Sequence, residues 1–176
     1  MVPSNLRKRL TMVSRVSVPK NLRAWDWAVL LGATCLGIGF SPLVPATVAS
    51  AATAAAALFL APHLSTLHLL AAVVLLTLAA GPLAAATERL LQTSDPKMFV
   101  LDEVAGQLLV FAFHEINLRT VVLGFLLFRV FDVVKLPPAD ALEKVGRGWG
   151  VVLDDLAAGI YANLALGALL WLVSRM

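Results

Sequence analysis

The sequence has a single cysteine, few charged side chains and few aromatic ones. One cysteine excludes an internal disulfide and a cysteine-based metal cluster, and Cys35 is expected to be a small packing residue. Charged residues make up 14% of the chain, whereas about 25% of a soluble domain is charged. The scarcity of charge therefore argues against a soluble domain.

Several recurrent catalytic patterns are also missing. The histidines, His63, His68 and His114, are scattered, do not have metal-ligand spacing, and are expected to serve loops or packing. No Ser–His–Asp or Cys–His arrangement is present. The basic N-terminal segment lacks interleaved aromatic residues, so nucleic acid is not an expected partner.

Apolar residues are abundant in the sequence. Hydrophobic residues make up 60% of the 176 residues, and the mean hydropathy is +0.86. A bilayer core of about 30 Å requires about 20 apolar residues per helix. The fold class we predict is all-α, a polytopic helical membrane bundle with short or re-entrant helices, because five apolar runs are present: Ala46–Ala61, Leu64–Ala86, Val100–Phe113, Leu118–Val134 and Leu156–Val173. The third and fourth runs are the short ones.

The net charge of +3 is distributed unevenly. Residues 1–23 form a basic arm, and residues 24–176 form the expected membrane domain. By the positive-inside rule the arm stays cytoplasmic. It either rests on anionic membrane lipid or only sets the topology. Trp25 and Trp27 are typical interfacial anchors. The arm contains no acid and six basic residues: Arg7, Lys8, Arg9, Arg15, Lys20 and Arg23.

The stretch "GFSPLVPAT", residues 39–47, interrupts the first apolar segment. Pro42 and Pro45 prevent a continuous helix, so we expect a half-helix over Ala28–Phe40 and a new helix from Pro45 or Ala46. Following the runs across the membrane places residues 39–50, 95–106 and 129–155 on one face. The same path places His63, His114 and the C-terminus on the other face.

Two acid pairs follow apolar runs, in "FVLDEVAGQ" (99–107) and "VVLDDLAAG" (151–159). Ionisable groups in apolar segments usually pair with one another or mark a site. Four carboxylates repel unless protons, basic groups or a cation intervene, and oxygen-only ligands suit Mg²⁺. Because adjacent helical residues point about 100° apart, we expect one acid of each pair to face the bundle interior and the other to reach the interface. The alternative is that both pairs are ordinary helix starts. Gly106 and Gly159 follow the pairs and allow close helix packing.

Basic partners occur in "FRVFDVVKLPP", residues 128–138. Arg129, Asp132 and Lys135 are spaced along one helical face. Arg129 offers a bidentate fork for phosphate and Lys135 a point charge. The alternative is a self-satisfied ladder of these three side chains. Ser41 and Thr47 flank an expected helix N-terminus, where they either help to bind an anion or simply cap the helix.

Taken together, these motifs resemble the phosphatidylglycerophosphatase A family over most of residues 35–165. Three segments carry the resemblance, although Ala46 stands where the family usually has glycine and "KLPP" replaces its usual K-P-W-P. The segments are "GFSPLVPATVAS", "DPKMFVLDEVAGQ" and "LFRVFDVVKLPPADALEKVGRGWGVVLDDLAAGIYA". The resemblance implies a Mg²⁺-dependent phosphatase of the bacterial inner membrane. Such an enzyme acts in phospholipid biosynthesis, converting phosphatidylglycerophosphate to phosphatidylglycerol.

The residues and the resemblance lead to one hypothesis. Mg²⁺ is held by four acids, which also orient or deprotonate a water: Asp102, Glu103, Asp154 and Asp155. Asp132 completes this shell, while Arg129 and Lys135 bind the phosphate at the cytoplasmic interface. Ser41, Thr47 and Asp95 are secondary candidates.

Three questions stay open at this point. Attack by water and a transient aspartyl-phosphate are both compatible with the sequence. The oligomeric state is undetermined. A different class of function also remains, a small membrane transporter or assembly subunit that uses buried carboxylates for ions or protons.

Overall fold

The computed structural model describes residues 19, 21–94, 96–137, 142, 145–146 and 148–175. The described part is helical and contains no strand, which confirms the all-α prediction. Most of the basic arm, and the secondary candidate Asp95, lie outside the described residues. The chain forms, in order, α2 (Ala24–Ala33), η1 (Ile38–Phe40), α3 (Pro45–Leu60), η2 (Ala61–His63), α4 (Thr66–Leu91), α5 (Leu101–Val110), α6 (Leu118–Val134) and α8 (Trp149–Ser174).

Three segments are long and apolar enough to cross a membrane: Pro45–His63, Thr66–Leu91 and Trp149–Ser174. They correspond to the first, second and fifth predicted runs. The ten residues of α5 extend only about 15 Å, roughly half of a bilayer core. The third run is therefore a short helix packed among longer ones, as the fold class anticipated.

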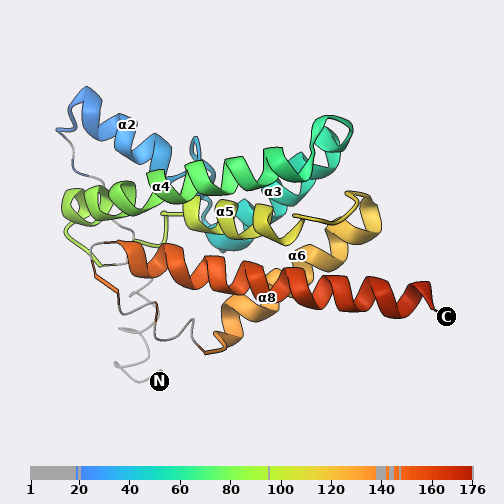
Figure 1. Cartoon of the computed structure of the whole chain (residues 1–176). Helices are drawn as coiled ribbons and strands as arrows, with labels where there is room; N and C mark the ends of the chain where they lie inside the picture. Colours follow the sequence, from blue (N-terminus) through green and yellow to red (C-terminus); the bar gives the residue numbers. More distant parts are fainter. Residues whose placement is uncertain are drawn as a thin grey trace, which may run out of the picture.

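The short helix α5 lies at the centre of the bundle, between α4 and α8 (Figure 1). Glycines make its contact with α8 close. A Cβ on Gly106 would lie 2.7 Å from the backbone oxygen of Asp155, and a Cβ on Gly159 would lie 2.6 Å from the oxygen of Gly106. The expectation that these two glycines allow close helix packing is confirmed, and the packing brings the two acid-bearing helices together.

The predicted half-helix over Ala28–Phe40 is only partly right. The helix α2 begins at Ala24, before the apolar run, and ends at Ala33. Left-handed backbone at Cys35, Leu36 and Gly37 then turns the chain into η1. The predicted restart is confirmed, because α3 begins at Pro45, where proline's missing N–H needs no intrahelical partner.

At the end of α5 remote from the acids, a side chain on α8 holds the backbone. The Asn163 amide donates to the carbonyls of Leu109, Val110 and Ala112 at 2.7–3.2 Å. His114 lies at the same end, with Nε2 3.1 Å from the backbone carbonyl oxygen of Asn163. His68 Nδ1 lies 3.1 Å from Ser65 Oγ at the start of α4. Both contacts agree with the expected loop and packing roles of histidine.

Candidate active site

Three carboxylates from two helices form the core of the candidate site. Asp102 and Glu103 start α5, Asp155 lies in α8, and one oxygen from each falls within 4.8 Å of the others. Asp102 and Asp155 are buried, and Glu103 is half-buried. This cluster, hereafter the acid cluster, unites side chains from the two motifs that the sequence singled out.

Backbone contacts hold the acid cluster in place. The Val100 N–H, just before α5, donates to the Ala33 oxygen of α2 at 2.9 Å, which fixes where α5 begins.

In α8 the acids are not at a helix start, because α8 begins at Trp149 and Asp155 lies more than one turn inside it. The alternative of two ordinary helix starts therefore fails for Asp155.

Asp132 and Arg129 stand beside the acid cluster on α6. Arg129 pairs with Asp132 at 2.9 Å and donates to Ser50 Oγ of α3 at 3.3 Å. The charges of both α6 residues act on Glu103. A guanidinium close to grouped carboxylates balances part of their charge and offers two parallel donors to a phosphate. The predicted meeting of Arg129 and Asp132 with the acids is found.

Lys135 reaches the site by a different route from the predicted helical face. It is the C-cap of α6 in left-handed conformation, with φ of 46°, so it has already left the helix. Its Nζ lies 2.7 Å from Asp154 Oδ2. The single ladder of Arg129, Asp132 and Lys135 is therefore wrong, because each cation pairs with a different aspartate.

Asp154 also departs from expectation. It is buried along with its neighbour Asp155, although one acid of each pair was expected to reach the interface. Its place beside the Lys135 ammonium accounts for this, since a buried carboxylate requires a partner. Asp154 lies next in sequence to the acid cluster but outside the three-carboxylate group.

Ser41 and Thr47 are less closely tied to the acids. Ser41 Oγ donates to the Leu43 oxygen at 3.1 Å, within its own turn. Thr47 lies in the first turn of α3, three residues before Ser50, whose hydroxyl accepts from Arg129. Of the two secondary candidates described, Thr47 is thus the one on the helix that Arg129 contacts.

Burial alters the acidity of the pair on α5, a helix that is not one of the three candidate spans. Burial raises the pKa of Asp102 well above its usual range, and the charges of Glu103 and Asp155 raise it further. The pKa of Glu103 is also raised, chiefly by burial, and Asp132 adds to this while Arg129 opposes it. Grouped carboxylates of this kind need protons or a cation to balance them.

Comparison with known proteins identifies the family. The family model described as phosphatidylglycerophosphatase A matches residues 31–170, which include every described residue of the site. The chain belongs to the phosphatidylglycerophosphatase A family. Membership in this family makes it a phosphatase by descent, and the matched region contains all three candidate membrane spans over most of their length.

Two relatives of this family member are named as lipid phosphatases. A Bacteroides thetaiotaomicron protein, provisionally named phosphatidylinositol-3-phosphatase, is 34% identical over 151 residues, covering 82% of this chain and 94% of its own. Phosphatidylglycerophosphatase A of Haemophilus influenzae is 34% identical over 77 residues, covering 43% of this chain and 47% of its own. No solved structure matches the chain.

Gln107 was not among the predicted site residues of this family member. Both polar atoms of its fully buried side chain, and Glu103 Oε2, have no hydrogen-bond partner among the residues that the structure describes. Gln107 follows Glu103 by one helical turn, so the two side chains are neighbours on α5. A polar residue in an apolar helix, one turn from an acid, was the sequence signal for it.

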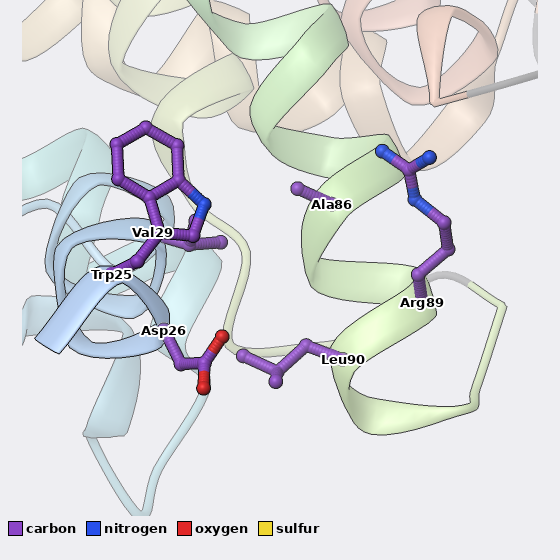
Figure 2. Close-up of a pocket in the computed structure, with 6 residues that line it drawn as sticks. All are labelled: Trp25, Asp26, Val29, Ala86, Arg89 and Leu90. Atoms are coloured by element: carbon purple, nitrogen blue, oxygen red, sulfur yellow. The ribbon is translucent and has the colours of Figure 1, made fainter. Parts of the chain in front are cut away.

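A hollow lies between α2 and α4, apart from the acid cluster. Figure 2 shows Trp25 and Asp26 on one side of it and Arg89 and Leu90 on the other. Asp26 already accepts from the Arg23 N–H at 2.8 Å, and Arg89 Nε donates to the Ala85 oxygen at 3.1 Å. The polar groups of this hollow thus serve the ends of their own helices.

Proposed function

We propose that this protein is a Mg²⁺-dependent phosphatase that hydrolyses phosphatidylglycerophosphate to phosphatidylglycerol. The observation that carries the proposal is the acid cluster, three carboxylates within 4.8 Å beside an arginine–aspartate pair. Family membership favours a phosphatase over the alternative of a transporter that uses buried carboxylates.

The donor set fits a hard divalent cation. All the ligand atoms are carboxylate oxygens, and Glu103 Oε2 is buried without a hydrogen-bond partner in the described part of the chain. Such an atom costs about 1–3 kcal/mol when it is left unsatisfied. Asp102, Glu103 and Asp155 would hold Mg²⁺, which prefers a few carboxylates together with water and phosphate oxygens. When bound, the ion would supply positive charge to offset the charge of a phosphoryl group.

The cationic side chains would bind the phosphate. Arg129 and Lys135 are held at the site by Asp132 and Asp154, so they are oriented before substrate arrives. An arginine fork matches two phosphate oxygens, whereas a lysine contributes a point charge. Both would stabilise charge that develops on the phosphoryl oxygens during the reaction. Thr47 and Ser41 are proposed as outer contacts of the same phosphate.

Hydrolysis by direct attack of water uses the groups at the site. The water oxygen forms a bond to phosphorus while the bond from phosphorus to the glycerol oxygen breaks. A carboxylate of the acid cluster takes the water proton, and the departing glycerol oxygen takes one in turn. We propose that Gln107 helps to orient this water, because its amide both donates and accepts and lies one turn from Glu103. An aspartyl-phosphate at Asp102 or Asp155 is the competing route.

The choice of substrate is the finer part of the proposal. The names of the two relatives point to different lipids, phosphatidylglycerophosphate and phosphatidylinositol 3-phosphate. Both are phosphate monoesters on phospholipid head groups. We favour phosphatidylglycerophosphate because the family model over residues 31–170 has that description. We also propose that the protein resides in a bacterial inner membrane, with the acid cluster and the N-terminus on the cytoplasmic side.

The test is phosphate release by the purified protein in detergent or vesicles. We expect release from phosphatidylglycerophosphate that requires Mg²⁺ and is lost in Asp102→Asn and Asp155→Asn variants that still fold. Phosphatidylinositol 3-phosphate is assayed at the same concentration. Faster release from the inositol lipid would overturn the substrate assignment, and ion flux in liposomes without release from either lipid would overturn the phosphatase.

A further inference from the structure

An apolar cavity of about 360 Å³ lies among α3, α4, α5 and the turn before η1. Its walls are almost entirely hydrocarbon and are widened by small side chains, notably Ala52, Ala56, Ala57 and Ala72. The hydroxyl of Thr53, which also lines it, donates to the Ala49 oxygen at 2.8 Å. Only the apolar part of Thr53 is therefore left to face the cavity.

The cavity begins at the level of the acid cluster. Val104, which lines it, directly follows Glu103 on α5. At the same end it is lined by Cys35 and Ile38, and this turn follows Ala33, whose oxygen accepts from the Val100 N–H just before α5. The start of the cavity and the start of the candidate site are thus built from the same stretch of chain.

From there the cavity runs away from the acids along the candidate spans. On α3 it extends from Ala52 to Leu60, a distance of about 12 Å at the rise of an α-helix. On α5 it extends to Leu108, and Leu64 lines its far end. Leu60 is 44% exposed, and Ala56 and His68 are exposed as well. The cavity is therefore open along one side.

The chemistry of the surroundings identifies the occupant. Two candidate spans, Pro45–His63 and Thr66–Leu91, supply most of the walls, so in a bilayer the open side faces lipid tails. A dry apolar space of this kind attracts hydrocarbon and excludes charged or polar ligands. An alanine-lined cavity that begins at Val104, next to Glu103, and extends along two candidate spans matches a lipid chain attached to a phosphorylated head group.

We propose that this cavity binds one acyl chain of the phospholipid substrate while its phosphate lies at the acid cluster. This inference rests on the proposed function and adds the place where the lipid chain is bound. A head group without long chains is then a poor substrate, because it lacks the hydrophobic contact with the cavity.

The test fills the cavity with matched variants. Ala52→Phe and Ala56→Phe place a ring on lining positions, whereas Ala51→Phe and Ala55→Phe place it on neighbouring exposed positions that do not line the cavity. Rates are measured with dioleoyl and dihexanoyl phosphatidylglycerophosphate in the same detergent. We expect the ratio of kcat/KM for the long-chain over the short-chain lipid to fall at least about tenfold in the lining variants. The control variants keep the wild-type ratio.

An unchanged ratio in the folded lining variants, or an equal fall in the controls, would overturn the inference. If the wild type releases no phosphate from either lipid, the proposed function fails, and the cavity is tested by photocrosslinking. A phospholipid with a diazirine on its acyl chain should label the peptide around Ala52 and Ala56, and less so in the lining variants than in the controls. Absence of that labelling would overturn the inference in its turn.

Discussion

The two acid pairs share a local geometry and differ in what surrounds them. In each pair the first aspartate accepts a hydrogen bond from the next residue's N–H at 2.9 Å, Asp102 from Glu103 and Asp154 from Asp155. Both members of the α5 pair join the acid cluster, whereas α8 contributes only Asp155. The remaining acid, Asp154, pairs with Lys135.

The difference shows that a repeated motif need not have a repeated role. The α5 pair starts a short helix in the middle of the bundle, where α8 closes on it through Gly106 and Gly159. The α8 pair lies more than one turn inside a long helix, within reach of both the acids of α5 and Lys135 at the end of α6. One side chain then turns toward the acids of α5 and its neighbour toward the end of α6. Variants at Asp155, Asp154 and Lys135 test this division.

Removing the charge of the clustered acid should have the largest effect. We expect Asp155→Asn to reduce phosphate release by about 10²–10⁴-fold, as for the loss of a group that handles a proton or holds the attacking water. The protein should also lose the increase in Tm that Mg²⁺ gives the wild type, since a ligand stabilises only the state that binds it. Equal rates of phosphate release in Asp155→Asn and wild type would show that Asp155 takes no part in the reaction.

Neutralising the neighbouring acid, Asp154, should reduce phosphate release less. Asp154→Asn leaves the three clustered carboxylates intact and loosens Lys135, so we expect a loss of about 10–100-fold, typical of residues that support a site from outside. Lys135→Met should act through the same contact, with a rise in KM greater than the fall in kcat. The stabilisation by Mg²⁺ should persist in Asp154→Asn. Its complete loss would mean that the two acids of α8 have the same role.

The contact between the helices can be tested without changing a charge. A Cβ at Gly106 would lie 2.7 Å from the Asp155 oxygen and 2.7 Å from the Phe128 ring. We expect Gly106→Ala to lower the free energy of unfolding by about 1–3 kcal/mol through overpacking. Gly146→Ala is the control, because in the described part of the chain a Cβ there would have no neighbour within 4 Å beyond the adjacent residues. Thermal unfolding followed by tryptophan fluorescence measures both, and equal Tm values would contradict the close packing.

The sequence predicted which segments form helices better than it predicted which side chains of those helices meet. Periodicity, proline at Pro45 and the glycines after each acid pair are local signals, and the structure follows them. The side chain that each acid meets is decided by packing between distant helices, which no local pattern encodes. The left-handed cap at Lys135 ends α6 one residue before the lysine, so Lys135 does not share the helical face predicted for it with Arg129 and Asp132. The burial of Asp154 was missed for a related reason, because its partner Lys135 comes from the end of α6.

Gln107 shows the same limit of prediction from a local sequence pattern. In the sequence it is one polar residue in an apolar run, and only the structure reveals that its amide is fully buried with no hydrogen-bond partner in the described part of the chain. An unsatisfied amide in the core is unfavourable by about 1–3 kcal/mol. A group kept there at a cost to stability is a candidate for a role in the reaction.

The smallest predicted effect follows from that cost. Gln107→Leu removes the unsatisfied amide but keeps the volume, so we expect the Tm to be unchanged or raised. Phosphate release should fall about tenfold through kcat, with little change in KM, because the water that attacks phosphorus is oriented less well. Gln107→Glu, which keeps the reach and one acceptor, serves as the matched variant. A lower Tm with an unchanged rate per folded molecule would make Gln107 a packing residue and leave the acids to orient the water alone.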